Sequence, residues 1–300
     1  MKKKLLFLGC NHDEIPYLKV LKRQNWYVVG ADLNSEAPGR ELCNSFYNVG
    51  YDELSQLIEI GVKEGFTSGD KVFTASAQFA HVGAANFAQT YGIYYPSEKV
   101  INLCLDKAAY YEYFQLHNVP IPRTWYVNTK KSLSDLVASM SNSKWYYLKS
   151  DFSKNPNYVY RFNASSVPYE KIFWGRDRYL REFYILQEEF PGVSLRLNLY
   201  GDRFNVFDFN TGKKTIDHHE RLIALNVVKT LQEFMWAQGL DHWLIKFDVI
   251  LNHNEYAVLD IGMDPPSRML RFSNEKNVCF PNFYIDQYLY GQVTYPDIVD

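Results

Sequence analysis

The chain has 300 residues, of which 47% are hydrophobic and 22% charged, and its formal net charge is −2. This composition is that of a globular protein with two or three packed subdomains, and it excludes a disordered chain. A charge so close to neutral argues against nucleic acid or an anionic membrane surface as partner, so small molecules are the expected ligands. No stretch approaches the roughly 20 apolar residues of a membrane span.

The cysteines indicate the redox environment. Cys10, Cys43, Cys104 and Cys279 are widely spaced and form no CxxC pair. This spacing argues against a zinc knuckle and gives no sign of a disulfide framework, and it predicts free thiols in a reducing compartment. The apolar core of residues 1–10 is shorter than the roughly 7 to 15 residues of a signal peptide, so we interpret it as a β-strand. We therefore expect a cytoplasmic protein. The sequence leaves the oligomeric state open, with a homodimer as one option.

The first hundred residues alternate between apolar runs and amphipathic segments. This βαβ pattern predicts a small parallel α/β domain over residues 1–97. Its first turn, Gly9-Cys-Asn-His, lacks the GxGxxG of a dinucleotide fingerprint, which disfavours an NAD-dependent oxidoreductase. Strands are expected at 4–8, 26–30 and 71–74, with helices at 14–24 and 54–64.

The remainder of the chain has an antiparallel style. A helical pattern over 97–117 gives way to Val119-Pro-Ile-Pro, whose prolines fix an extended approach to a strand. A hairpin is expected over 195–209 with its turn at Gly201-Asp202, and Gly239 is expected to cap a long helix. Further strands are expected at 145–149, 158–162 and 184–190, a helix at 222–238, and a second hairpin from 243–251 and 256–261.

Two lysines stand out among the polar residues. Lys107 follows Asp106 at the start of a predicted helix, and Lys149 ends the apolar strand Trp145-Tyr-Tyr-Leu. An isolated lysine is usually solvated. An ammonium at the end of an apolar strand is nevertheless costly unless an anion faces it, and a nucleotide phosphate satisfies that requirement.

Two aspartates lie within runs that otherwise build a core. Asp248 follows Leu244-Ile-Lys-Phe, and Asp260 follows Tyr256-Ala-Val-Leu. Paired across a hairpin, their carboxylates suit Mg²⁺, a hard cation that prefers carboxylate and phosphate oxygens. The alternative is that backbone groups or an arginine satisfy both carboxylates.

The order of these groups resembles the ATP-grasp superfamily, over nearly the whole chain from Leu5 to about Arg268. In that superfamily an α/β domain precedes an Asp-Lys helix, a strand lysine, an acidic hinge that ends in Gly, and a closing metal hairpin. Residues 30–39 and 118–124 are similar to the branch of biotin carboxylase and carbamoyl-phosphate synthase. The resemblance implies a Rossmann-like pre-ATP-grasp domain at 1–97, followed by an ATP-grasp fold of two α+β subdomains at 98–185 and 186–300.

The resemblance also implies a chemistry. Members of this branch are ligases that use ATP and Mg²⁺ to convert a carboxylate into an acyl phosphate. An amine or another nucleophile then displaces the phosphate, with ADP and phosphate as products. By resemblance, Lys107 and Lys149 hold the α- and β-phosphates, the hinge backbone at Gln187, Glu188 and Glu189 binds the adenine, and Asp248 and Asp260 ligate Mg²⁺.

Several residues depart from the family pattern. Residues 150–157 contain no glycine, although the family has a glycine-rich flap there, and Gly262 stands where an asparagine ligand is expected. Asp264 is the predicted replacement for that ligand, and Arg268 the predicted arginine beside the acyl phosphate. Arg196 either reaches the γ-phosphate or lies on the surface. The departures keep open an ATP-grasp relic that binds a nucleotide or other ligand without ligation.

Overall fold

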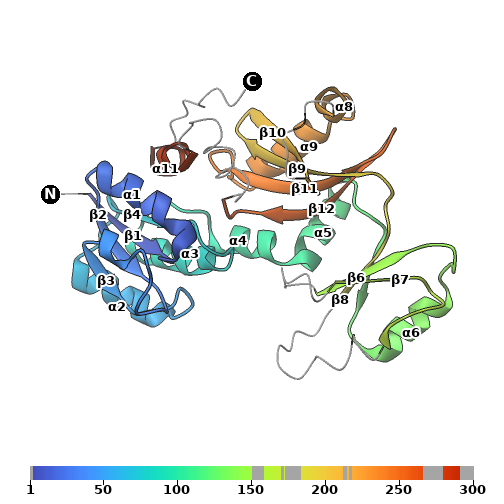
Figure 1. Cartoon of the computed structure of the whole chain (residues 1–300), viewed down its shortest axis with the longest axis horizontal. Helices are drawn as coiled ribbons and strands as arrows, with labels where there is room; N and C mark the ends of the chain where they lie inside the picture. The colour runs from blue at the N-terminus through green and yellow to red at the C-terminus, as the bar shows by residue number, and fades with distance from the viewer. Residues whose placement is uncertain are drawn as a thin grey trace.

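A computed structural model describes residues 3–150, 159–169, 172, 184–211, 215, 218–265 and 280–290 of the chain. Within these residues the protein is a mixed α/β structure with three four-stranded sheets, one in each third of the chain (Figure 1). None of the described helices is long and apolar enough to cross a membrane. Cys10, Cys43 and Cys104 are free thiols, as predicted, and Cys279 lies outside the described residues.

The first sheet is parallel, which confirms the predicted βαβ opening. Its central strand is buried on both faces, because Leu5, Leu6, Phe7 and Leu8 have no exposed surface, and parallel sheets are typically covered by helices on both sides. In the order β3-β2-β1-β4 the strands are β1 (Lys4–Leu8), β2 (Tyr27–Ala31), β3 (Ser45–Tyr47) and β4 (Lys71–Thr74), and the helices are α1 (Ile15–Arg23), α2 (Leu54–Glu64) and α3 (Ala80–Tyr91).

The helical pattern at 97–117 is two helices rather than one. α4 (Glu98–Leu105) ends at Asp106, whose backbone is extended with φ −89° and ψ 110°. The Asp106 carboxylate accepts hydrogen bonds from the backbone N–H groups of Ala108 and Ala109, which makes it the N-cap of α5 (Lys107–Leu116). The helical pattern is therefore interrupted by a side-chain cap, and a helix starts at Lys107 as predicted. The break places Lys107 at the first position of α5.

The second sheet is antiparallel throughout, as expected. Helix α6 (Lys130–Ala138) packs on it through Leu133 and Val137. The predicted subdomain boundary between residues 185 and 186 falls inside β8, which pairs with both β5 and β6. In the order β5-β8-β6-β7 the strands are β5 (Thr124–Val127), β6 (Tyr146–Ser150), β7 (Val159–Phe162) and β8 (Tyr184–Glu188).

The third sheet consists of two antiparallel hairpins, and the first turns at Gly201, with φ 52°, as predicted. The helix expected at 222–238 is interrupted at Asn226, whose φ of 55° is left-handed and ends a helix. Gly239, with φ 65°, follows the second helix as predicted. The elements are β9 (Val193–Tyr200), β10 (Arg203–Asp208), β11 (Ile245–Leu251), β12 (Tyr256–Gly262), α8 (His219–Ala224) and α9 (Val227–Ala237).

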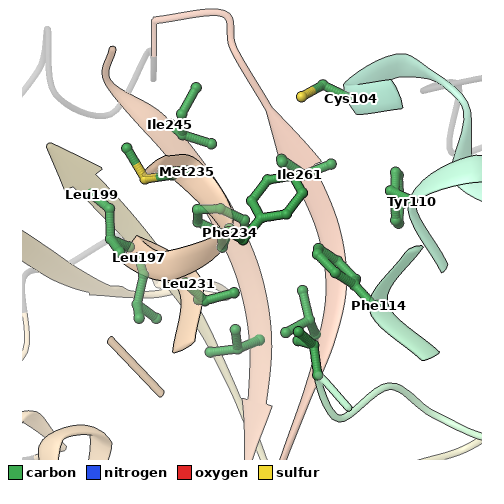
Figure 2. Packing of buried hydrophobic residues seen from close by; sticks show 14 of the residues in the cluster. Cys104, Tyr110, Phe114, Leu197, Leu199, Leu231, Phe234, Met235, Ile245 and Ile261 are labelled. Carbon is green, nitrogen blue, oxygen red and sulfur yellow. The ribbon is translucent and has the colours of Figure 1, made fainter. Parts of the chain in front are cut away.

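One face of the third sheet carries the largest hydrophobic core. Helices α4, α5 and α9 pack there, and the rings of Phe114 and Phe234 meet edge to face with centroids 5.2 Å apart (Figure 2). Ile245 and Phe247 of β11 point into this core, whereas Lys246 is half-buried on the other face. At the β10 end, the other face packs against α11 (Phe280–Tyr290) and the first domain. The rest of that face is left for polar residues.

Candidate functional site

A cavity of about 690 Å³ is lined by residues of the second and third sheets and of the turn between them. Polar side chains of both sheets face this cavity, and most of them are residues that the sequence analysis singled out. Eight of the ten predicted site residues line it: Lys107, Lys149, Gln187, Glu188, Glu189, Arg196, Asp248 and Asp260. Asp264 is not part of the lining, and Arg268 lies outside the described residues.

A β-bulge shapes the floor of the cavity. Asp248 of β11 pairs with Asp260 of β12, but the next residue, Val249, pairs with Val258, so that Leu259 is the extra residue. As a result, Leu259 and Asp260 both line the cavity, although they are neighbours in one strand. The two predicted carboxylates are therefore direct cross-strand neighbours on the cavity face.

Asp260 is bound to the start of α5. The Lys107 ammonium donates to Asp260 Oδ1 at 2.7 Å, the Tyr110 hydroxyl donates to the same oxygen at 2.9 Å, and the Ile261 N–H does so at 3.1 Å. Burial and the Asp260 charge raise the pKa of Tyr110 well above its usual value, so that the hydroxyl stays protonated. Tyr111 donates to the Leu259 carbonyl at the bulge.

Sequence reasoning missed both tyrosines. A signal was present: Tyr110 and Tyr111 are three and four residues after Lys107, which places them on the same helix face.

Asp248 is bound to Arg196, its neighbour on β9. The guanidinium donates from Nε to Oδ1 at 2.7 Å and from Nη2 to Oδ2 at 2.8 Å, a bidentate pair. The side chains are 17% and 14% exposed, so the pair is largely withdrawn from water. Arg196 also lies over the Phe209 ring, 5.1 Å from its centroid. An arginine thus satisfies this carboxylate, and Arg196 lines the cavity instead of lying on the outer surface.

Lys149 faces the floor from β6 and has a neutral partner. Its ammonium donates to Gln187 Oε1 at 2.7 Å, and the Gln187 amide donates in turn to Thr124 Oγ1 at 3.0 Å. Burial, together with the nearby Lys107 ammonium, lowers the pKa of Lys149 to about 8. An anion close to this ammonium would favour its charged form.

The acidic turn lies at the rim. The Glu188 carboxylate pairs with Lys144, and the Glu189 carboxylate accepts from Arg161 at 3.0 and 3.1 Å. Their backbone N–H groups donate to the carbonyls of Arg123 and Trp145 at 3.0 and 2.8 Å. Two of the three hinge residues predicted to bind the adenine therefore already use their backbone N–H groups within the protein.

The next backbone N–H along the turn belongs to Phe190, and it donates no hydrogen bond among the described residues. Phe190 also lines the cavity. Gly192, two residues later, has φ 155°, and a Cβ there would lie 2.5 Å from the Leu251 carbonyl oxygen, so only glycine fits where the hinge meets β11.

Asp264, the predicted replacement for the asparagine ligand, is paired with a lysine. Its carboxylate pairs with the Lys246 ammonium, and Lys246 lines the cavity. A Cβ at Gly262 would lie 2.2 Å from Lys246 Cε, so the lysine stem lies across the bare glycine backbone. Lys246 is another residue that sequence reasoning missed, although its position two residues before Asp248 placed it on the same strand face.

The donor set allows a limited test of the implied Mg²⁺. Asp248 and Asp260 face each other in register and supply oxygen ligands, so they suit one divalent cation once Arg196 and Lys107 move aside. Asp264 is directed to Lys246. Within the described ranges no group of three or more His, Cys, Asp or Glu side chains is placed to hold a metal.

Neither a family model nor a curated protein matches the sequence. Solved structures do match the fold, and the three described here have TM-scores above 0.6. N5-carboxyaminoimidazole synthetase from Staphylococcus aureus, complexed with ADP, gives a TM-score of 0.70 at 12% identity, covering 96% of this chain and 78% of that one.

Two further structures extend the likeness. The biotin carboxylase domain of Hydrogenobacter thermophilus 2-oxoglutarate carboxylase, with MgADP, ADP and bicarbonate, gives a TM-score of 0.69 at 13% identity over 98% of this chain and 71% of that one. A RimK domain ATP-grasp protein from Sphaerobacter thermophilus gives 0.63 at 13% identity over 95% and 99%. Identities this low establish the fold alone, and by that measure the chain has the ATP-grasp fold, as its sequence motifs predicted.

Proposed function

We propose that the chain binds ATP with Mg²⁺ in this cavity and activates a carboxylate as an acyl phosphate. An amine or another nucleophile then attacks, and ADP and phosphate leave. The observation that carries the proposal is a pair of ammonium groups in one cavity, Lys107 on α5 and Lys149 on the second sheet. Two adjacent carboxylates, Asp248 and Asp260, line the same cavity. Two proteins of the same fold hold ADP, and one of them also holds bicarbonate, a small carboxylate-like anion.

The chain's own residues would position the nucleotide. Lys149 and Lys107 bind phosphate oxygens, because each ammonium gains a charged partner there. The Phe190 N–H, which has no partner among the described residues, binds an adenine ring nitrogen, while Gln187 keeps Lys149 in place. Apolar residues suited to the flat faces of a base line the same cavity: Pro122, Ile250 and Leu259.

Asp248 and Asp260 would hold the metal. A bound Mg²⁺ neutralises phosphate oxygens during phosphoryl transfer. With Asp248 engaged as a ligand, Arg196 would be without its bidentate partner and would be available to bind the γ-phosphate. Arg268, outside the described residues, keeps its place beside the acyl phosphate only as a sequence prediction. The carboxylate and amine substrates, the cytoplasmic location and a homodimer are likewise predictions.

Nucleotide binding is the first test. Millimolar ATP with Mg²⁺ is expected to raise the melting temperature, by an amount set by RT ln(1 + [L]/Kd), and NAD is expected to leave it unchanged. Lys149→Met should lose the shift, whereas Lys229→Met, on the exposed side of α9, should keep it. ADP release is then measured with a panel of carboxylic acids and amines. The absence of any shift with wild-type protein would contradict the proposal at its first step.

A second candidate is a nucleotide-binding protein without ligase activity. The observation that favours it is that a lysine or arginine already neutralises each of the three carboxylates, Asp248, Asp260 and Asp264. In that case ATP stabilises the protein with little dependence on Mg²⁺, and no acid in the panel stimulates ADP release. The two candidates therefore separate in the same pair of measurements.

A further inference from the structure

The cavity face of the third sheet carries a second polar row, parallel to the first. The first row contains Arg196, Asp248 and Asp260, which are cross-strand neighbours. Two residues further along each strand, Asn198 of β9 pairs with Lys246 of β11, and Lys246 pairs with Gly262 of β12. Because side chains alternate along a strand, the second row lies on the same face as the first.

The position of this row relative to the hinge is fixed by register. The hinge leads into Val193, which pairs with Leu251, whereas Arg196 pairs with Asp248 and Asn198 with Lys246. The first row therefore lies nearer the hinge, and the second row lies beyond it. A nucleotide whose base contacts the hinge and whose phosphates contact the first row has its free end directed at the second row.

Asn198 is the first sign that the second row binds something. It is 0% exposed, and neither its Oδ1 nor its Nδ2 has a hydrogen-bond partner among the described residues. Buried amides are nearly always hydrogen-bonded, and one without a partner destabilises the fold. The three leucines around it, Leu195, Leu197 and Leu199, belong to the core on the opposite face, so the amide lies on the same sheet face as Arg196 and Lys246, buried next to the cavity and not in its lining.

Lys246 is the second sign. Its stem crosses Gly262 so closely that any larger residue there would displace it, and the ammonium meets Asp264. Both side chains are mostly buried, with 14% and 23% exposed. A lysine that lines a cavity and pairs with a carboxylate can exchange that carboxylate for an incoming anion without being left uncompensated.

We propose that Lys246 and Asn198 form a subsite for a small oxyanion, in which the anion replaces Asp264 as the partner of the Lys246 ammonium and accepts a hydrogen bond from the Asn198 amide. The subsite rests on the proposed function only for its place beyond the phosphates. Two sources supply this chemistry, the terminal phosphoryl group of the nucleotide and the carboxylate of the substrate. Asp264 is then the resting counter-ion of Lys246 and not a ligand of the metal.

The direct test uses inorganic phosphate and acetate as probes, titrated by calorimetry into the nucleotide-free protein. Lys246→Met is expected to weaken the binding of the probes by at least about tenfold, since a charge-assisted hydrogen bond is lost. Lys229→Met, an exposed control, should bind like wild type. Asp264→Asn should strengthen binding severalfold by removing the competing carboxylate. Equal affinity of wild type and Lys246→Met would overturn the subsite, as would weaker binding by Asp264→Asn.

Asn198→Leu separates a binding role from a structural one. An orphan amide replaced by an apolar side chain of similar size should leave the melting temperature unchanged or raise it, while the affinity for phosphate falls severalfold. A lower melting temperature together with unchanged phosphate affinity would show that Asn198 is structural and would remove it from the subsite.

A third experiment, which measures nucleotide and acetate binding by Lys246→Met, identifies the source of the anion and also tests the proposed function. If Lys246→Met weakens binding of a non-hydrolysable ATP analogue but not of ADP, the anion is the terminal phosphoryl group. If it leaves both nucleotides unaffected and weakens acetate binding to the ADP-saturated protein, the anion is the substrate carboxylate. Failure of ADP to bind at all would sink the proposed function, whereas the nucleotide-free titration still decides the subsite.

Discussion

The two walls of the cavity hold their cations in opposite ways. On the third sheet and α5, each cation has its own carboxylate: Lys107 with Asp260, Arg196 with Asp248 and Lys246 with Asp264. On the second sheet, Lys149 rests on the neutral amide of Gln187. One wall is therefore compensated in charge before any ligand arrives, and the other is not.

This difference separates two tasks. Pairing each cation with a carboxylate allows the third sheet and α5 to bury several charges, because an unpaired buried charge is far more costly than a paired one. A buried lysine with only an amide partner has a lowered pKa, as Lys149 does, and that pKa rises again when an anion binds. Changes to the floor should thus appear mainly in stability, and changes to Lys149 mainly in affinity.

The largest effect is expected on the floor. Asp248→Ala leaves the Arg196 guanidinium largely buried without its bidentate partner, so the free energy of unfolding should fall by roughly 3 kcal/mol. Urea denaturation measures this directly. The double variant Arg196→Met/Asp248→Leu should recover most of the loss, because an apolar pair replaces an ion pair. A single variant as stable as wild type would show that the pair is not buried in solution.

The next largest effect is expected at Lys149 on the second sheet. Lys149→Met removes a phosphate contact and an ammonium with a lowered pKa, so affinity for ADP should fall by about tenfold or more while stability stays level or rises. Calorimetry and thermal denaturation measure the two quantities. Unfolding of this variant with unchanged affinity would reverse the contrast between the walls.

Sequence reasoning identified this contrast only in part. Lys107, Lys149, Asp248 and Asp260 were accessible because each interrupts an apolar run or starts a helix, and such positions are visible without coordinates. The pairing of each carboxylate with a particular cation was not accessible, since it depends on strand register. The bulge at Leu259 is an example: one extra residue turns Asp260 toward Asp248, and no local propensity announces it.

The elements themselves followed local rules more closely than the contacts did. Strand bounds were predicted to within about two residues because apolar runs and turn glycines mark them. The helical patterns at 97–117 and 222–238 are each divided into two helices, the first at Asp106 and the second at Asn226. Both residues form caps or left-handed turns readily, which is a local signal that helical periodicity alone conceals.

A pH titration sharpens the contrast further. With a pKa of about 8 in the free protein, Lys149 is charged at pH 7 and loses its proton above pH 8. Bound phosphate raises that pKa, so binding takes up a proton and ADP affinity should fall above pH 8, by at most tenfold per pH unit. Lys149→Met should lack this dependence. Affinity that stays constant from pH 7 to 9 in wild type would contradict the lowered pKa.

Stability should respond to the same proton with the opposite slope. Above pH 8 the folded protein binds fewer protons at Lys149 than the unfolded chain does, because the unfolded lysine titrates near its usual value of about 10.4. The contribution of Lys149 to the free energy of unfolding therefore increases as pH rises from about 8 toward that value. The difference in stability between wild type and Lys149→Met isolates this contribution from all other groups.

The smallest effect is expected at the rim, where both partners face water. Arg161 binds Glu189 through two hydrogen bonds and lies over the Trp145 ring, 3.9 Å from its centroid, yet the two charged side chains are 44% and 31% exposed. Exposed pairs contribute little because solvent screens them, so Arg161→Ala should lower stability only slightly and should change ADP affinity less than twofold.

The salt dependence of this variant completes the argument. A rim pair is screened by electrolyte, so the small loss of stability in Arg161→Ala should shrink further at 1 M salt, whereas the loss in Asp248→Ala should persist because its partner is shielded from solvent. Urea denaturation at low and high salt compares the two. If the loss in Arg161→Ala matched that of Asp248→Ala and resisted salt, the hinge would be part of the compensated floor, and the division between the walls would lie elsewhere.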